Sequence, residues 1–255
     1  MNQERNITRL DAFTYRTLIE GDPVMLIPVG SVEQHGPHMP LGVDMMLSTK
    51  MAELVAEKTG ALVGPTITTG YKSQQRSGGG NHIVGSFGFD AATVIGICRT
   101  FVQEFARHGL KSVAFVNGHY ENYQFIYEGV DLALRDLAVE GAPQVMLLSY
   151  WDFVTEKVIS RLYPDGFPGW DVEHGGVMET SLMLEYFPDL VRMERVMDLP
   201  AADLPPYDLL PVDPTLTPDS GCLSSAREAS AEKGRILADS IVSGIIDALR
   251  SRFMV

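Results

Sequence analysis

The sequence predicts an α/β fold in which helices pack against a mostly parallel sheet, and two observations support this prediction. Short apolar, β-branched runs alternate along the chain with longer stretches of helical character, as they do in βαβ units. The hydrophobic fraction is 45% and the charged fraction is 21%, values typical of a soluble globular protein with a full core. Because no repeat, low-complexity tract or linker divides the 255 residues, we expect a single domain over residues 1–255.

The first predicted strand is Val24–Val29, whose sequence VMLIPV is apolar at every position and therefore typical of a buried parallel strand. Residues 44–59 follow with a helical pattern. Gly60 predicts the end of that helix, because glycine readily adopts the left-handed conformation found at helix C-termini. The next apolar run, Ala61–Pro65, is a candidate for a short strand, so these segments together predict one βαβ unit.

The remaining elements repeat this alternation. Asp90 predicts a helix N-cap, and the helix that follows it reaches about His108. Near the end of the chain, Ser224 or Ser225 predicts the N-cap of an amphipathic helix that reaches Arg250. Between these two helices lie a predicted strand at 113–116, a helix at 121–140 and a strand at 145–149.

Three stretches lack this alternation and are predicted to be long loops. They are rich in glycine, proline or polar residues and span 69–89, 163–170 and 199–221. Loops of this length in a compact domain are usually functional or form an interface, so we expect them to contribute to a site or a contact.

The formal net charge of −13 argues against nucleic acid as a partner, because the phosphates would be repelled and no Lys/Arg cluster stands out. No run of about 18 apolar residues occurs, so we expect no membrane partner. Met1–Glu20 lacks the continuous apolar segment of a secretory signal, which predicts a cytoplasmic protein. In that compartment the widely separated Cys98 and Cys222 should be reduced thiols.

Carboxylate and imidazole side chains follow two of the buried strands. Glu33-Gln-His35 comes shortly after the first strand, and His119-Tyr-Glu121 follows a later one. Residues two apart in an extended segment point to the same side, and the carboxyl ends of parallel strands gather at one edge of the sheet. The two pairs can therefore converge, with Asp44 at the start of the next helix as a fifth candidate ligand.

Five candidate ligands are too many for one tetrahedral zinc ion with an open position, but they suit two divalent cations that share one carboxylate. The charges of two such cations are balanced by the three carboxylates and one bridging hydroxide. A cation pair polarises a carbonyl and lowers the pKa of a shared water molecule. The alternative is that each pair is a hydrogen-bonded turn and that Asp44 is only a helix N-cap. The spacing favours the metal interpretation and leaves the substrate open.

Three blocks of the sequence resemble the signature blocks of the creatininase family. Further stretches resemble its creatinine-hydrolysing members, and the resemblance spans roughly residues 8–250. The three blocks are Glu33-Gln-His35-Gly-Pro-His-Met-Pro-Leu-Gly-Val-Asp44, Asn117-Gly-His119-Tyr-Glu121-Asn and Glu173-His174-Gly-Gly-Val-Met-Glu179-Thr-Ser. The further stretches are Gly70–His82, Leu148–Val154, Tyr163–Asp171 and Leu204–Asp208.

This resemblance implies an α/β/α sandwich of Rossmann-like topology that assembles as a homohexamer, a trimer of dimers. It also implies how the ligands are shared between two cations. Glu33, Asp44 and His119 would hold one cation, and His35, Asp44 and Glu121 would hold the other, so that Asp44 bridges them. The cations would be zinc, with manganese possible at one site, and the donor types alone do not choose between these metals.

The substrate that the resemblance implies is creatinine, a flat cyclic amide that the enzyme would open reversibly to creatine. A site for such a ring needs apolar faces above it and a few polar contacts at its edge. The two tryptophans, Trp151 and Trp170, would supply the faces, although core packing explains Trp151 equally well from the sequence alone. Ser77 and Tyr120 would contact the substrate, and Trp170 lies on a loop able to gate access.

The expected catalytic residues are His174, Glu173 and Glu121. A hydroxide bridging the cations would attack the amide carbonyl, and one cation with the backbone around Tyr120 would stabilise the oxyanion. His174, oriented by Glu173, would transfer a proton to the leaving ring nitrogen, and both residues would also contact the substrate. Glu179 lies on the helix after His174 and is expected to support a ligand rather than to bind a cation.

Two other functions remain open from the sequence. A creatininase-family amidohydrolase acting on another small amide, a formamide or a short peptide would keep the same ligands, and only the pocket would differ. A non-catalytic regulator that binds a nucleotide or a metal would need neither five ligands nor an acid–base histidine. The glycine run Gly78–Gly80 lacks the Lys-Ser/Thr that follows a phosphate-binding loop, which argues against a nucleotide.

Overall fold

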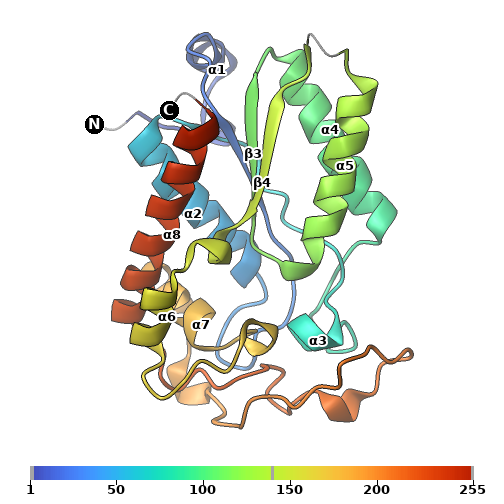
Figure 1. The fold of residues 1–255 in the computed structure, drawn as a ribbon, viewed down its shortest axis with the longest axis vertical. Coiled ribbons are helices and arrows are strands. Elements are labelled where there is room, and N and C mark those ends of the chain that lie inside the picture. The colour runs from blue at the N-terminus through green and yellow to red at the C-terminus, as the bar shows by residue number, and fades with distance from the viewer. Residues whose placement is uncertain (1–2, 139–140, 254–255) are drawn as a thin grey trace.

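Four parallel strands form the sheet at the centre of the computed structural model, which describes residues 3–138 and 141–253 (Figure 1). The strands lie side by side in the order β2-β1-β3-β4. Their bounds are Met25–Val29 for β1, Leu62–Val63 for β2, Ser112–Asn117 for β3 and Gln144–Ser149 for β4. The four predicted strands are therefore confirmed, although β2 is shorter than the sequence predicted.

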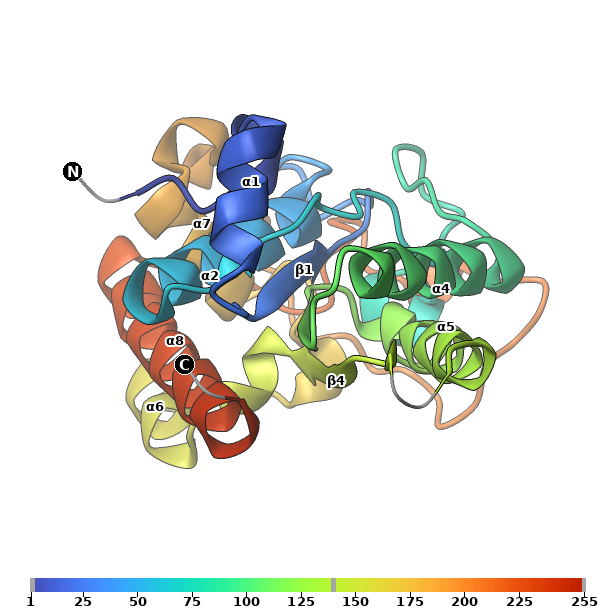
Figure 2. The same ribbon diagram turned by 90° about the horizontal axis from the view of Figure 1, so that it is seen from above.

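Helices cover both faces of the sheet, as Figures 1 and 2 show. α4 (Ala91–Arg107) and α5 (Tyr123–Asp136) pack together on one face, while α2 (Val43–Thr59) and α8 (Ala231–Arg252) lie on the other. α7 (Val177–Tyr186) packs against α8. The shorter helices are α1 (Ala12–Ile19), α3 (Gln75–Gly78) and α6 (Glu156–Leu162). This arrangement confirms the predicted α/β fold with a parallel sheet between helices.

The strand residues alternate between two hydrophobic clusters, one on each face of the sheet. Leu26 and Val116 belong to the cluster that includes α2 and α8, whereas Ile27 and Phe115 belong to the cluster that includes α4 and α5. All four side chains are fully buried, which explains why β1 is apolar at every position. Burial on both faces fixes the register of the strands, because a slip by one residue would exchange the two faces.

The predicted helix ends depend on local backbone chemistry. Gly60 ends α2 in the left-handed conformation with φ of 78°, and its N–H donates to the carbonyl oxygen of Ala56. Asp90 caps α4, and its side chain accepts a hydrogen bond from the N–H of Thr93 at 2.9 Å. α2 begins at Val43, so Asp44 lies within the first turn of the helix and not at its N-cap. The carboxylate of Asp44 is therefore free for another use.

α8 begins later than the sequence predicted. Its N-cap is Ser230, whose side chain accepts a hydrogen bond from the N–H of Lys233 at 3.2 Å. The predicted caps, Ser224 and Ser225, are wrong because bends and a turn, and not a helix, follow them directly. The N–H of Ala229 donates to the carbonyl oxygen of Ala226, so the chain makes a separate turn before Ser230 and the helix starts only after that turn.

α5 also differs from the predicted helix at 121–140. A 3-10 turn occupies Tyr120–Asn122, so α5 starts at Tyr123, and it ends at Asp136. Residues 139 and 140 lie outside the described residues. The helices α1 and α6 were not predicted, although their N-caps, Asp11 and Thr155, are of a type that begins helices.

Both cysteines, Cys98 and Cys222, are buried and free of disulfide bonds, as predicted for reduced thiols. Within residues 3–138 and 141–253, no helix combines the length and apolarity that a membrane span requires.

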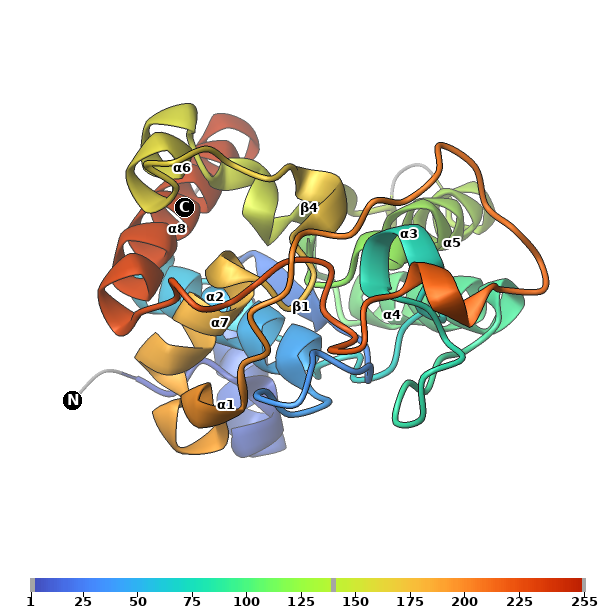
Figure 3. The same ribbon diagram turned by 90° about the horizontal axis from the view of Figure 1, so that it is seen from below.

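The carboxyl ends of the strands point toward the end of the molecule where α3, α6 and α7 lie (Figure 1). The segment 199–221, drawn in orange, crosses this end as an irregular chain, which Figure 3 shows from below. The long loops of the sequence therefore gather at the edge where the polar residues after β1 and β3 emerge.

Candidate metal centre and adjoining cavity

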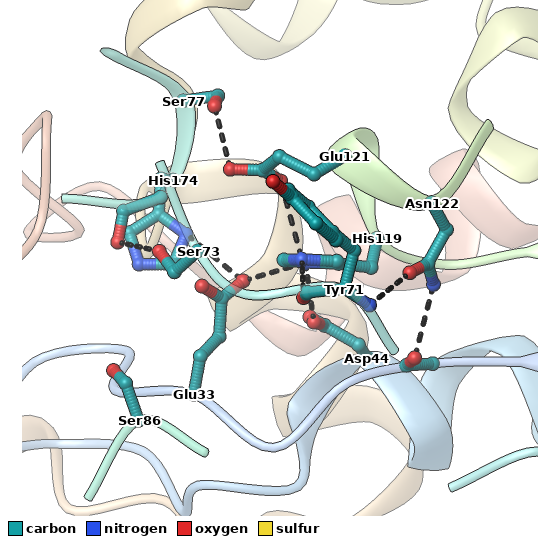
Figure 4. Close-up of polar contacts among 12 residues, drawn as sticks. Glu33, Asp44, Tyr71, Ser73, Ser77, Ser86, His119, Glu121, Asn122 and His174 are labelled. Carbon is teal, nitrogen blue, oxygen red and sulfur yellow. Dashed lines mark hydrogen bonds and ion pairs between the residues drawn. The ribbon is translucent and has the colours of Figure 1, made fainter. Parts of the chain in front are cut away.

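Glu33, Asp44 and His119 meet at the carboxyl edge of the sheet and form a first group of candidate ligands (Figure 4). Glu33 follows β1, Asp44 lies in the first turn of α2, and His119 follows β3. Nδ1 of His119 lies 2.9 Å from Oε1 of Glu33 and 3.1 Å from Oδ2 of Asp44. All three side chains are buried, so their donor atoms face one another and not solvent.

A second group shares Asp44 and lies beside the first. Nε2 of His35 is 3.1 Å from Oδ1 of Asp44 and 3.6 Å from Oε1 of Glu179, which α7 supplies. The two groups thus use different oxygens of the Asp44 carboxylate, as expected of a carboxylate that bridges two cations. His174 lies close by, with Nδ1 3.9 Å from Oε1 of Glu33, and forms a further compatible set of donors with Glu33 and His35.

Two glycines allow the strand ends to approach α2 closely. A Cβ atom at Gly30 would lie 2.3 Å from Cα of Met45, and one at Gly118 would lie 2.6 Å from the carbonyl oxygen of Asp44. Any larger residue at these positions would push the first turn of α2 away from the edge of the sheet. The glycines that follow β1 and β3 therefore place Asp44 between the two groups.

Backbone carbonyls orient both histidine rings. Nδ1 of His35 lies 3.1 Å from the carbonyl oxygen of Glu33, and Nε2 of His119 lies 3.0 Å from that of Tyr71. Because a carbonyl oxygen only accepts, the facing nitrogen of each ring carries the proton. In the neutral rings, the opposite nitrogens, Nε2 of His35 and Nδ1 of His119, then face the carboxylates with the lone pair that a cation would take.

Several buried atoms of the two groups lack hydrogen-bond partners among the described residues. They are Nε2 of His35, Oδ2 of Asp44 and Oε2 of Glu33. Some of these atoms lie close to other polar atoms of the groups, but without the alignment that a hydrogen bond requires. A buried polar atom without a hydrogen-bond partner lowers the stability of the folded protein. The ligand atoms of each group lie within 4.8 Å of one another. Imidazole nitrogen and carboxylate oxygen suit zinc and manganese, so the residues fit two divalent cations.

The electrostatics of the cation-free groups agree with this fit. Burial disfavours the charged form of both histidines, but nearby carboxylates outweigh burial and hold the pKa of His35 and of His119 well above the usual range. The raising charges are Glu179 and Asp44 for His35, and Glu33 and Glu121 for His119. Protons on the imidazoles thus supply the positive charge that cations would supply, so cation binding should release protons.

Glu121 lies in a different place from the one predicted. Its Oε1 accepts hydrogen bonds from the N–H of Gln74 at 2.6 Å and from Oγ of Ser77 at 2.7 Å. Its Oε2 lies 3.2 Å from Nε2 of His119, on the side of the ring opposite to the first group. The cause is local, because residues 120–122 form a 3-10 turn and not the extended backbone that would point residues 119 and 121 to one side.

Glu179 instead occupies the position beside His35 and Asp44 that was predicted for Glu121. It lies in the first turn of α7, and its Oε2 also accepts a hydrogen bond from the N–H of Gly175 at 2.7 Å. Only a supporting role was predicted for it, since nothing in local spacing shows which residues of α7 face the sheet edge. The family-like block that contains Glu179 was the available signal.

The contacts of His174 and Glu173 also differ from the prediction that Glu173 orients His174. Nε2 of His174 lies 2.8 Å from the carbonyl oxygen of Gln34 and 3.0 Å from its side-chain Nε2. Glu173 accepts a hydrogen bond from the N–H of Met178 and lies 3.4 Å from Oγ of Ser224. The free N–H groups and positive dipole at the start of α7 attract this carboxylate. Gln34 is therefore the residue whose contacts orient His174.

A cavity of about 320 Å³ opens onto the two groups. Trp151 is half-buried in its wall and packs edge-on against Tyr150, with ring centroids 5.3 Å apart, whereas Trp170 is 44% exposed. The wall includes every residue predicted to contact the substrate, namely Ser77, Tyr120, Trp151, Trp170, Glu173 and His174. The structure thus brings six residues from distant segments to one cavity.

The wall also contains residues that were not predicted to contact the substrate. Tyr150 is buried and precedes Trp151, Asp171 follows Trp170, and Asp208 comes from the segment 199–221. The first two could have been found as neighbours of the tryptophans. Asp208 lies in the family-like stretch Leu204–Asp208, but only the tertiary fold brings that stretch to the cavity.

The sequence and the structure are both similar to those of known creatininases. The sequence matches the family model Creatininase, described as creatinine amidohydrolase, over residues 8–249. It is 54% identical to the creatinine amidohydrolase of Pseudomonas putida over 236 residues, which cover 91% of each chain. A solved creatininase with manganese and a mutant creatininase complexed with creatine each match with a TM-score of 0.96 at 50% identity, covering 99% of this chain and 100% of theirs. A mutant creatininase of the Zn-Zn type matches with a TM-score of 0.97 at the same identity and coverage.

The matched region contains both groups of candidate ligands and the whole wall of the cavity. Sequence identity of 54% over 91% of the chain accompanies a nearly complete structural match. This protein therefore belongs to the creatininase family.

Proposed function

We propose that this protein hydrolyses the cyclic amide bond of creatinine to give creatine, in a reversible reaction that depends on two divalent cations. The observation that supports this most strongly is the pair of ligand groups that share Asp44 beside a cavity lined by Trp151 and Trp170. Similarity to a creatinine amidohydrolase over 91% of the chain supports the same substrate.

The proposed first cation position is built by Glu33, Asp44 and His119, and the second by His35, Asp44 and Glu179. The unpaired buried lone pairs support zinc at both positions, with manganese able to occupy one of them. Two divalent cations bound there would polarise an amide carbonyl and lower the pKa of a bound water molecule. Glu179 thus takes the ligand role that the family resemblance implied for Glu121.

The substrate ring is proposed to lie against the indoles of Trp151 and Trp170, which supply apolar faces and exclude water. Ser77 donates its hydroxyl hydrogen to Glu121 at 2.7 Å, which leaves the lone pairs of the Ser77 oxygen to accept from a substrate N–H. Tyr120 is 66% exposed at the wall of the cavity, and its backbone is proposed to contact a substrate oxygen. Glu121 is therefore proposed to orient Ser77.

His174 is proposed to transfer a proton to the leaving ring nitrogen. Its ring is buried, is held by Gln34 and lies 4.4 Å from the ring of His35 between centroids. Burial raises the pKa of Glu173 to about 8, although the hydrogen bond from Met178 opposes this rise. A carboxyl group with such a pKa exchanges protons near neutral pH, which supports a role for Glu173 in supplying the proton.

One assay tests this function. Purified, zinc-loaded protein is incubated with creatinine, and creatine is measured with and without a chelator. We expect creatine to form, to stop forming when the cations are removed, and to form again when zinc is restored. Absence of creatine under all three conditions would reject the substrate. Parallel reactions with a formamide and a short peptide would then show whether the family chemistry acts on another amide.

We further propose that residues 1–255 form one domain, that the protein is cytoplasmic, and that it assembles as a homohexamer, a trimer of dimers. Large exposed apolar side chains support assembly, since Val84 is 97% exposed and Leu210 is 82% exposed. Light scattering after size-exclusion chromatography should give six times the 28.0 kDa of one chain. A mass of 28.0 kDa would contradict the assembly.

A further inference from the structure

A buried hydrogen bond connects the two segments that carry the ligands of the second cation position. His38 lies between His35 and Asp44 in sequence, and its Nε2 is 2.9 Å from Oγ1 of Thr180 on α7. Thr180 directly follows Glu179, the ligand that α7 supplies. His38 is 2% exposed and Thr180 is 0% exposed. Solvent therefore cannot replace this bond if one partner is removed.

The surrounding contacts assign a direction to this bond. Oγ1 of Thr180 donates to the carbonyl oxygen of Gly175 at 3.5 Å, so it accepts from the Nε2–H of His38. Nδ1 of His38 has no hydrogen-bond partner in the described part of the chain. Burial lowers the pKa of His38 to about 4, and the positive charge of His35 adds to this effect. At neutral pH the imidazole of His38 is therefore a neutral, fixed donor.

Close backbone packing surrounds the same region. A Cβ atom at Gly36 would lie 2.3 Å from Sγ of Cys222, and one at Gly175 would lie 2.6 Å from the same sulfur. The carbonyl oxygen of His38 also accepts a hydrogen bond from the N–H of Arg192 at 2.8 Å. The loop after β1 and the segment before α7 are thus packed against one sulfur. Their side-chain hydrogen bond is then well placed to set the distance between the ligands that they carry.

The first cation position is built differently. Glu33 and His119 follow strands of the sheet, and Asp44 lies on α2, so α7 supplies none of its ligands. The hydrogen bond that orients His119 goes to Tyr71, far from α7 in sequence. Movement of α7 relative to the loop after β1 should therefore disturb one position and spare the other.

We propose that His38 and Thr180 are positioning residues for the second cation position, and that their hydrogen bond raises its affinity without changing that of the first. This inference rests on the proposed metal centre. Loss of the bond frees His35 and Glu179 to separate, while the first position keeps its geometry. Hydrogen bonds that support metal ligands in this way typically change metal affinity by roughly 10- to 100-fold.

Zinc titration of the metal-free protein, followed by calorimetry, tests this inference without an activity measurement. The unmodified protein should bind two equivalents. Thr180→Val removes the hydroxyl at nearly constant volume and should weaken one equivalent by roughly 10- to 100-fold while the other stays unchanged. Thr180→Ser keeps the hydroxyl and should restore both affinities. His38→Leu and His38→Gln give a second matched pair of loss and rescue, which keeps the test decisive if Thr180→Val does not fold.

Ser181→Ala is the control for loss of a buried hydroxyl on the same helix, because Oγ of Ser181 accepts from the N–H of Ser230 at 3.1 Å. It should lower the melting temperature and leave both zinc affinities unchanged. The inference would be overturned if Thr180→Val weakened both zinc equivalents equally or weakened neither. It would also be overturned if Ser181→Ala weakened one zinc equivalent and left the other unchanged. Fewer than two equivalents in the unmodified protein would contradict the proposed metal centre and the inference with it.

Discussion

The two proposed cation positions differ in how the chain builds them. The first takes Glu33 and His119 from the segments that follow two adjacent strands, β1 and β3. The second takes His35 from the same segment as Glu33, and it takes Glu179 from α7, a helix that does not directly follow a strand of the sheet. Asp44 belongs to both. Neighbouring strands thus bring together two of the segments that carry the first set of ligands, whereas the second set also depends on how α7 docks.

The shared carboxylate gives the largest expected effect. Asp44→Asn keeps the size of the side chain but removes the charge that both positions use, so zinc content should fall below one ion per chain. Activity on creatinine should fall by more than about 10³-fold, because the loss of metal-ion stabilisation costs several kcal/mol. Metal analysis by mass spectrometry and the creatine assay measure both quantities. Asp90→Asn, at the N-cap of α4, is the control and should keep zinc and activity.

A second experiment separates the two positions. Glu179→Gln should lose one zinc ion per chain, whereas Glu121→Gln should keep both, since Glu121 bonds Ser77 and the N–H of Gln74. Metal analysis of the two variants under the same dialysis conditions measures the difference. Two zinc ions in Glu179→Gln and one in Glu121→Gln would show that Glu121 is the ligand and that Glu179 is not.

The proton-transfer role can be separated from both cation positions. His174→Ala should lower kcat by roughly 10²- to 10⁴-fold and leave two zinc ions per chain, because the proposed role of His174 is in proton transfer and not in metal binding. Gln34→Leu should produce a smaller loss, since it removes the side chain that lies 3.0 Å from the His174 ring. Loss of zinc from His174→Ala would instead make His174 a ligand, in the set that it forms with Glu33 and His35.

The cavity wall should affect substrate binding more than chemistry. Trp170→Ala removes an indole that is 44% exposed and should raise KM about tenfold with little change in zinc content. Steady-state kinetics on creatinine measure this effect. Tyr127→Ala, which changes an aromatic residue that is 60% exposed on α5, is the matched control and should leave KM unchanged. A fall in kcat with constant KM would contradict a binding role for Trp170.

The smallest expected effect is a pH dependence of stability at His38. Its folded pKa of about 4 lies below the ordinary value of 6.5, so the unfolded chain binds more protons between these values. The stability of the folded protein should therefore fall as pH drops from 6.5 toward 4, by about 1 kcal/mol once solvent screening is allowed for. Urea unfolding at about pH 7 and pH 5 should show a steeper loss for the unmodified protein than for His38→Gln. Equal losses would contradict a buried neutral imidazole.

The sequence predicted the first position better than the second for physical reasons. Buried strands have a clear apolar pattern, and parallel strand ends must share an edge, so Glu33 and His119 could be placed together. Glu121 could not be placed, because a 3-10 turn of three residues replaces the extended backbone that its spacing suggested. Glu179 could not be placed either, because its contact depends on how α7 docks, and no local pattern encodes that docking.

In the fold and in the cavity, too, the features set by local sequence could be predicted, and those set by tertiary contacts could not. Local chemistry predicts the strands, the start of α4 at Asp90 and the end of α2 at Gly60, and the structure confirms these predictions. The start of α8 was missed because several serines precede the helix, and local sequence did not show that a turn separates Ser224 and Ser225 from its start. The position of Asp208 in the cavity wall was also not predicted, because tertiary contacts set the path of its long loop.

Anomalous diffraction from crystals grown with zinc would locate each cation independently of activity, and so would show whether Asp44 joins two cations. Data recorded on both sides of the zinc absorption edge should show two peaks per chain, roughly 3.5–4 Å apart. One peak should lie among Glu33, Asp44 and His119, and the other among His35, Asp44 and Glu179. A single peak per chain, or two peaks that do not share Asp44, would contradict the proposed metal centre.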